Sequence, residues 1–149
     1  MPQMIQFVVA EDDEDDQFLI EEALHSCAVR NPYVYVNDGV ELLDFLTKEL
    51  KEKPNRPAEA TFIILLDLNM PRMDGREALQ KLKADPAFRR IPLVILTSSK
   101  SDEDVIRSYE TGVNSFVTKP VSFEGLVSVI AELKRYWVEV VEIPKPSKL

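Results

Sequence analysis

The stretch 62–75, FIILLDLNMPRMDG, constrains the fold of this chain most strongly. It opens with five apolar residues, three of them β-branched or aromatic, and this run ends abruptly at Asp67. Such a run is typical of a strand buried on both faces of a parallel sheet. After a short loop, Asp74 and Glu77 form the capping pattern of a helix. Because open α/β sheets bind ligands just outside the carboxyl ends of their strands, Asp67 lies where a functional group is expected.

The same order of a short apolar strand and a capped helix recurs along the chain. The predicted strands are 5–10, 33–36, 62–66, 93–96 and 113–118, and the capping residues of the helices that follow are Asp13, Asp38, Asp74, Ser101 and Ser122. Each crossover helix must pack back onto the sheet, so the pattern predicts a parallel sheet with helices on both faces. We expect a doubly wound α/β fold in one domain, with a core over about 4–134 and a C-terminal helix extension and tail over about 135–149.

Polar side chains follow four of these strands at their C-terminal ends. They are Glu11 and Asp12, then Asp67, Thr97 and Lys119. Neighbouring carboxylates raise each other's pKa unless a cation neutralises them, and oxygen ligands without His or Cys favour Mg²⁺ or a similar hard ion. A cation, an ammonium and a hydroxyl together stabilise a phosphoryl group, and a carboxylate can itself accept that group. The predicted chemistry is phosphoryl transfer onto Asp67.

Composition excludes several classes of protein. The net charge of −8 argues against a general binder of nucleic acid or of anionic membranes. Cys27 is the only cysteine, so it cannot form an internal disulfide, and it fits a reducing compartment. We see no signal-peptide pattern and no apolar run near the ~20 residues of a membrane span. We therefore expect a cytoplasmic protein that binds neither nucleic acid nor membrane.

The chain resembles the receiver domains of two-component response regulators over nearly its whole length. The elements that carry the resemblance are Glu11-Asp12, the segment LLDLNMPRMDG, Thr97-Ser98 and Lys119-Pro120, in that order. The resemblance implies a flavodoxin-like five-stranded sheet of order 2-1-3-4-5. It also implies a phosphoryl donor in a sensor histidine kinase, and no enzymatic activity beyond the protein's own phosphorylation and dephosphorylation.

The resemblance also implies a role for each site residue. Asp67 would be the phosphoacceptor, Asp12 a direct ligand of Mg²⁺ or Mn²⁺, Glu11 a ligand through water and Asn69 a ligand through its backbone carbonyl. Thr97 and Lys119 would contact the phosphoryl oxygens, and Phe116 would be the aromatic switch together with Thr97. Two positions depart from the family pattern: the first acid is Glu11 instead of Asp, and the switch residue is Phe116 instead of Tyr. The resemblance further implies a cis peptide bond between Lys119 and Pro120.

A narrower resemblance links the chain to the stand-alone regulators of cyanobacterial and bacterial phytochrome kinases. It rests on the long connection 51–60, the phrase DPAFRRIP and the ending YWVEVVEIP. It implies a phytochrome as the partner kinase. We also expect a homodimer through the fourth helix, the fifth strand, the fifth helix and the tail. The reason is that Tyr136, Val138, Val141 and Ile143 have no obvious partner within the chain, and exposed apolar patches usually mark an interface.

Three alternatives use parts of the same pattern. A haloacid-dehalogenase-type phosphatase also has an Asp nucleophile at a strand end, but it requires a second Asp two residues later, where this chain has Asn69. A binding module that keeps the fold without the chemistry would not need the complete set of polar strand ends. A flavodoxin would carry a phosphate-binding loop rich in Ser, Thr and Gly after the first strand, which is acidic here. The sequence therefore favours a receiver.

Overall fold

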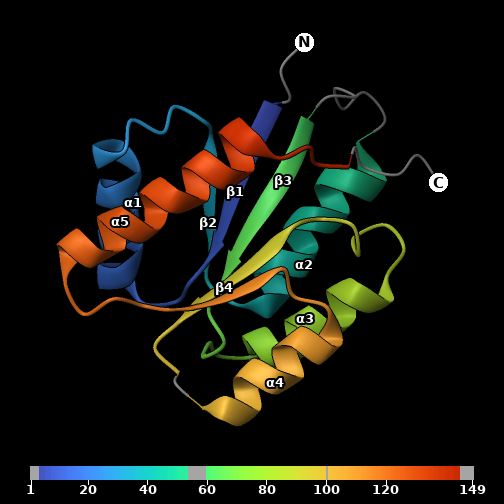
Figure 1. Cartoon of the computed structure of the whole chain (residues 1–149). Helices are drawn as coiled ribbons and strands as arrows, with labels where there is room; N and C mark the ends of the chain where they lie inside the picture. The colour runs from blue at the N-terminus through green and yellow to red at the C-terminus, as the bar shows by residue number, and fades with distance from the viewer. Residues whose placement is uncertain (1–3, 54–59, 100, 145–149) are drawn as a thin grey trace.

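A parallel sheet runs through the centre of the computed structural model, which describes residues 4–53, 60–99 and 101–144 (Figure 1). Its strands are β1 (Met4–Ala10), β2 (Tyr33–Val36), β3 (Ala60–Leu66), β4 (Leu93–Thr97) and β5 (Ser115–Thr118). They lie in the order β2-β1-β3-β4-β5, and every neighbouring pair is parallel. The predicted doubly wound, flavodoxin-like fold is therefore confirmed.

Helices cover both faces of the sheet (Figure 1). On one face lie α1 (Glu14–Ser26) and α5 (Phe123–Lys134); on the other lie α2 (Gly39–Thr47), α3 (Gly75–Ala84) and α4 (Asp102–Thr111). Two π-helical segments, η1 (Lys48–Glu52) and η2 (Arg135–Val140), continue α2 and α5. In the described ranges, none of these helices combines the length and apolar character that a membrane span requires.

Each of the five α-helices in the described ranges begins at the capping residue that the sequence predicts. The side chain of each cap accepts a hydrogen bond from the backbone N–H three residues later; the caps are Asp13, Asp38, Asp74, Ser101 and Ser122. These bonds satisfy amide groups that have no partner within the helix. The helix starts are thus determined locally, and each lies near the edge of the sheet where the strands end.

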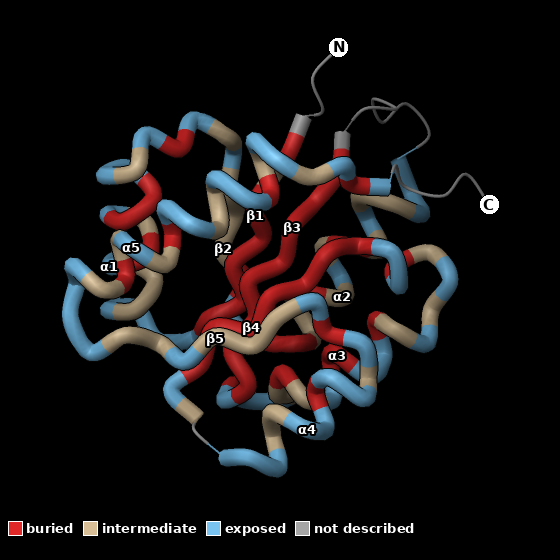
Figure 2. Tube along the Cα trace, in the orientation of Figure 1, coloured by how far each residue is buried: buried red, intermediate tan, exposed pale blue. Residues whose placement is uncertain are grey.

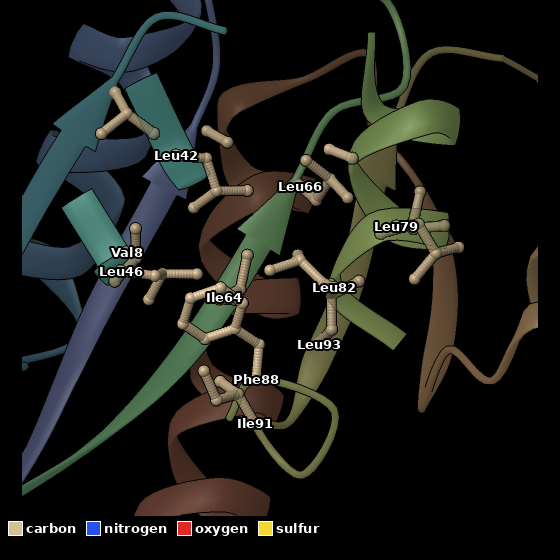
Figure 3. Close-up of a cluster of buried hydrophobic side chains, with 14 of the residues drawn as sticks. Val8, Leu42, Leu46, Ile64, Leu66, Leu79, Leu82, Phe88, Ile91 and Leu93 are labelled. Carbon is tan, nitrogen blue, oxygen red and sulfur yellow. The ribbon is translucent and has the colours of Figure 1, made fainter. Parts of the chain in front are cut away.

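Two apolar layers, one on each face of the sheet, form the interior, and the central strands are buried along most of their length (Figure 2). Alternate residues of β3 enter different layers: Ile64 and Leu66 pack toward α2 and α3, whereas Ile63 and Leu65 pack toward α1 and α5. The labelled side chains of the α2 and α3 layer in Figure 3 are Val8, Leu42, Leu46, Ile64, Leu66, Leu79, Leu82, Phe88, Ile91 and Leu93. Packing on both faces fixes the position of β3, and therefore also the position of Asp67, which follows it directly.

The last strand begins two residues later than predicted, at Ser115 instead of Val113. Gly112 adopts a left-handed conformation with φ of 114° and ends α4, and the Val113 N–H donates to the Ser108 carbonyl at 3.1 Å. Val113 therefore belongs to the helix C-cap, because its amide completes the capping motif. Residues 54–59 of the predicted connection 51–60 lie outside the described residues.

The structure contradicts most of the predicted exposure of the tail. Val138 and Val141 are partly buried and Ile143 is 3% exposed, and all three pack into the layer that contains Trp137. The π-helical bond from the Val141 N–H to the Tyr136 carbonyl, at 3.0 Å, ends the helix, and the following chain lies against the α1 and α5 layer. Tyr136 remains 50% exposed. The expectation that these apolar residues lack partners within the chain was wrong for Val138, Val141 and Ile143, and the ring of Tyr136 also contacts that of Trp137, with 5.1 Å between the ring centroids.

Gly75, the first residue of α3, packs against the backbone that follows β3. A Cβ atom at this position would lie 2.2 Å from the Asp67 carbonyl oxygen and 2.7 Å from the Leu68 Cα. We expect Gly75→Ala to lower the free energy of unfolding by about 1–3 kcal/mol, as overpacking does, in chemical denaturation. The control Gln80→Ala, on the exposed side of the same helix, should change it by less than about 0.5 kcal/mol. Equal effects of the two substitutions would contradict the close approach.

Candidate functional site

The ends of β3 and β4 and the residue after β5 bring three predicted site residues into direct contact. Asp67 follows β3 and is 6% exposed. Its Oδ1 accepts hydrogen bonds from the Thr97 hydroxyl at 2.7 Å and from the Asn69 backbone N–H at 3.1 Å. Its Oδ2 accepts one from the Lys119 ammonium at 2.9 Å. Asp67, Thr97 and Lys119 therefore share one site, as the strand order predicts.

The Lys119 ammonium also joins the end of β1 to this site. It donates to Glu11 Oε1, and to Asp16 Oδ2 at 2.8 Å. Glu11 was predicted here, whereas the sequence interpretation assigned no site role to Asp16. Asp16 lies in the first turn of α1, where the helix dipole favours acidic residues. Because this position already explains an acidic residue, nothing in the sequence indicated a contact with Lys119. The signal that could have identified it is its place in the acidic run EDDEDD at residues 11–16.

Burial and charge shift the pKa values of the site in different directions. Burial, followed by the charge of Asp67, raises the pKa of Glu11 against the opposing effect of Lys119. Burial would also raise the pKa of Asp67, but hydrogen bonds from Lys119, Thr97 and the Asn69 N–H outweigh it, so this pKa is lowered. Burial disfavours the charged form of Lys119, yet its carboxylate partners raise its pKa. Asp67 is therefore an ionised carboxylate next to a charged ammonium at neutral pH.

Three carboxylates at this edge of the sheet could hold a metal ion. Glu11, Asp12 and Asp67 each offer an oxygen atom, and these atoms lie within 4.8 Å of one another. Hard divalent cations such as Mg²⁺ prefer oxygen ligands, and this donor set contains neither His nor Cys. One ammonium leaves the carboxylates with excess negative charge, so the donor set fits a divalent cation. The role of the Asn69 carbonyl as a further ligand stays a prediction.

The predicted switch residue Phe116 lies on β5 and packs partly against the α2 and α3 layer. Its backbone N–H donates to the Tyr109 hydroxyl of α4 at 3.3 Å. The predicted cis bond between Lys119 and Pro120 is wrong, because no peptide bond in the described residues is cis. The Lys119 N–H donates to the Thr97 carbonyl at 2.7 Å, which continues the pairing of β4 and β5. The Lys119 side chain therefore contacts the carboxylates although the peptide bond to Pro120 is trans.

An ion pair beside the site links α3 to the start of α4. Arg76 donates from Nε to Asp104 Oδ1 at 2.7 Å and from Nη2 to Oδ2 at 2.6 Å. The Ser99 hydroxyl, in the loop after β4, also donates to Asp104 Oδ2, at 2.8 Å. Arg76 is the largest cause that lowers the pKa of Asp104, to about 2. The two helices next to the phosphoacceptor candidate are thus connected through a carboxylate that stays ionised.

Comparisons with known proteins agree with this geometry. Residues 7–131 match the response regulator receiver domain family. The chain is 36% identical to response regulator Rcp1 of Synechocystis sp. over 92% of this chain and 91% of Rcp1. It is also 36% identical to the probable methanogenesis regulatory protein FilR2 of Methanothrix harundinacea, over 94% of this chain and 88% of FilR2.

Two solved structures share the architecture of the whole chain. The Mn²⁺-bound form of Rcp1 superposes with a TM-score of 0.80 at 35% identity, covering 96% of this chain and 99% of that one. The phosphorylated cyanobacterial phytochrome response regulator RcpA superposes with a TM-score of 0.83 at 34% identity, covering 97% of this chain and all of that one. One of these relatives binds a divalent metal and the other carries a phosphoryl group. Metal binding and phosphorylation are also the two reactions that the polar groups around Asp67 fit.

Binding of Mg²⁺ should stabilise the folded chain, because the cation offsets the repulsion among the carboxylates. A Mg²⁺ concentration 100-fold above the dissociation constant should raise the free energy of unfolding by about 2.7 kcal/mol. We expect Asp12→Ala to remove most of this increase in thermal or chemical denaturation. The matched control is Asp15→Ala, which removes an exposed acid outside the carboxylate cluster. If Asp12→Ala and Asp15→Ala respond to Mg²⁺ equally, Asp12 is not a ligand.

The ion pair between Arg76 and Asp104 should make the free energy of unfolding depend on pH in the acidic range. Because the folded-state pKa of Asp104 is below its ordinary value of 3.8, its contribution is complete above that value and is lost as the pH falls toward about 2. We expect Asp104→Asn to lower the free energy of unfolding by about 1 kcal/mol at pH 7, since Arg76 is partly exposed. The difference should shrink below pH 3.8 in denaturation curves. Glu103→Gln, which removes an exposed pair with Arg107, is the control, and a pH-independent Asp104→Asn difference would refute the ion-pair explanation.

Proposed function

The chain belongs to the response regulator receiver family, and we propose that it receives its signal as a phosphoryl group on Asp67, transferred from the phosphohistidine of a sensor histidine kinase. The observation that carries this proposal is the contact set of Asp67, a buried and ionised carboxylate between the Thr97 hydroxyl and the Lys119 ammonium. The known family function requires such an acceptor. The chain thus acts as a phosphorylated signalling protein and not as an enzyme on a separate substrate.

The transfer follows from the chemistry of these groups. A carboxylate oxygen of Asp67 forms a bond to phosphorus as the bond between phosphorus and the histidine nitrogen breaks, and the electron pair of that bond stays on the imidazole. Lys119 and Thr97 donate to the carboxylate before transfer, and we expect them to donate to the phosphoryl oxygens afterwards. A divalent ion held by Glu11, Asp12 and Asp67 would supply positive charge against the phosphoryl oxygens.

The conformational readout follows from the change of partner at Thr97. In the unphosphorylated state the Thr97 hydroxyl donates to Asp67; in the phosphorylated state it would donate to a phosphoryl oxygen instead. This exchange would stabilise a different position of the end of β4 and of the loop before α4. We propose that Phe116, on the adjacent β5, turns inward in the phosphorylated state. This shift would change the surface formed by α4, β5 and α5, where a partner protein or a second copy of the chain would bind.

We further propose that the kinase is of the phytochrome type. Support comes from RcpA, which is a phytochrome response regulator and which this chain resembles over 97% of its length. The chain is equally identical, at 36%, to Rcp1 and to FilR2, so the type of sensor kinase has to be tested by experiment. Phosphotransfer from an autophosphorylated phytochrome kinase to this chain, faster than transfer from an unrelated histidine kinase at equal concentration, is the expected result. Equal or slower transfer would refute the phytochrome assignment and leave the chemistry at Asp67 unaffected.

Substitution of Asp67 tests the acceptor directly. Incubation with acetyl phosphate and Mg²⁺ should add one phosphoryl group to the wild-type chain, as measured by intact mass. Asp67→Asn keeps the shape of the side chain, removes the nucleophile and should abolish this gain. The control Asp15→Asn, an exposed acid on α1, should be phosphorylated at the wild-type rate. Phosphorylation of Asp67→Asn at that same rate would show that the acceptor is another residue.

A homodimer through α4, β5, α5 and η2 remains part of the proposal, on a smaller surface than the sequence indicated. Ile106, Tyr109, Tyr136 and Val140 are each at least half exposed, and the first two lie on α4 and the others on η2. In sedimentation at tens of micromolar, we expect the wild-type chain to be dimeric and a double substitution, Tyr136→Gln with Val140→Gln, to be largely monomeric. Val121→Gln, a fully exposed apolar residue after β5, is the control. A monomeric wild-type chain in both phosphorylation states would refute the dimer.

A further inference from the structure

A buried carboxylate at the start of α2 is bonded to the loop that follows Asp67. Asp38 is 4% exposed, and its two oxygens accept hydrogen bonds from Arg72: Nε donates to Oδ2 at 2.7 Å and Nη2 to Oδ1 at 3.2 Å. Arg72 lies in the β3–α3 loop, residues 67–74, which begins at the phosphoacceptor candidate. A carboxylate withdrawn from water requires a compensating charge, and a two-pronged guanidinium contact also fixes the relative orientation of the two groups.

The backbone at Arg72 needs such a contact. Its φ is 61°, in the left-handed region, which residues other than glycine rarely adopt. A residue in that region persists only where the surrounding structure holds it there, and such residues cluster at functional sites. The conformation of the β3–α3 loop is therefore imposed by its contacts. The pair with Asp38 is the closest side-chain contact of the strained residue, and Glu41 Oε2 lies farther away, 3.9 Å from Arg72 Nη2.

The next residue of α2 holds the loop by its backbone. The Gly39 N–H donates to the Met73 carbonyl oxygen at 2.9 Å, and a Cβ on Gly39 would lie 2.7 Å from that same oxygen. Only glycine permits this approach without a shift of the loop. Asp38 and Gly39 together bind Arg72 and Met73 through three hydrogen bonds, so the N-terminus of α2 fixes the middle of the β3–α3 loop.

The other half of the same loop carries the groups that face the site. The Asn69 N–H donates to Asp67 Oδ1 at 3.1 Å, and the Gly75 N–H donates to the Leu68 carbonyl at 2.9 Å. Asn69 is only three residues from Arg72. A shift of Arg72 would therefore be transmitted through few bonds to the Asn69 backbone.

We propose that Asp38 and Arg72 are positioning residues: their ion pair fixes the β3–α3 loop so that the Asn69 backbone is held against Asp67 for binding of a divalent cation. This inference rests on the proposed function, because it assumes that a cation held by Glu11, Asp12 and Asp67 also takes the Asn69 carbonyl as a ligand. Neither Asp38 nor Arg72 touches the cation, and both act through the loop. Groups that orient metal ligands in this way typically change metal affinity when they are replaced.

A purely structural role of the pair is the competing explanation. Asp38 is also the N-cap of α2, where it accepts the Glu41 N–H at 2.9 Å, so its loss could simply destabilise that helix. Two substitutions separate the roles. Asp38→Asn keeps a good capping residue and removes the charge. Arg72→Asn removes the ion pair and introduces a residue that tolerates the left-handed conformation better than most.

The first measurement uses the full chain without metal. Amide hydrogen exchange should become faster at the loop amides of Asn69, Met70, Arg72 and Met73 in Arg72→Asn and in Asp38→Asn, while the amides of β1 and β4 keep their wild-type rates. The control is Arg107→Gln, which removes an exposed arginine and its ion pair with Glu103 on α4. Unchanged exchange of the loop in both variants would overturn the proposal, because the ion pair would then not determine the conformation of the loop.

The second measurement is the affinity for Mg²⁺ alone, by calorimetric titration. Both variants should bind Mg²⁺ roughly 10-fold more weakly than the wild-type chain, and Arg107→Gln should bind it as the wild type does. Variants that lose stability but keep their Mg²⁺ affinity would overturn the proposal in favour of the structural role. A wild-type chain that binds Mg²⁺ but accepts no phosphoryl group would refute the proposed function, and the positioning role would still be decided by the affinity ratio. A wild-type chain that binds no Mg²⁺ would overturn both.

Discussion

The rest of the site depends on the contacts of the Lys119 ammonium with the carboxylates of Glu11, Asp16 and Asp67. The carboxylates come from the residue after β1, the first turn of α1 and the residue after β3, and Lys119 follows β5, so a single cation joins four parts of the fold. Partly buried carboxylates at this spacing would repel one another without it. Because Lys119 only partly balances their charge, the site also fits a divalent cation, and Asp67, the proposed nucleophile, remains ionised. In the proposed function, structural stability and phosphoryl chemistry thus depend on the same charges.

The sheet explains why these groups meet. Parallel strands end at one edge, and the strands are positioned by apolar side chains that alternate between two layers (Figure 2). A sequence can reveal this arrangement, because both the apolar runs and the polar residues that end them are local patterns. The convergence of Glu11, Asp12, Asp67, Thr97 and Lys119 could therefore be predicted, together with the helix caps and the doubly wound fold.

Other features depend on contacts between distant residues and had no local signal. Asp16 lies in an acidic helix start that needs no further explanation, and its contact with Lys119 joins residues 103 positions apart. The burial of Ile143 results from a π-helical turn that redirects the chain. In each case tertiary packing determined a detail that periodicity leaves open.

The central claim is that this arrangement of charges makes Asp67, among the acids at the edge of the sheet, the phosphoryl acceptor. The most direct measurement is site mapping of the phosphorylated wild-type chain. Borohydride reduces an aspartyl phosphate to an alcohol, so peptide mass spectrometry after reduction locates the modified residue. We expect the modification to be found at Asp67 and to depend on Mg²⁺. Modification at Asp12, Asp13 or Asp16 instead, or reduction products spread over several acids, would contradict it.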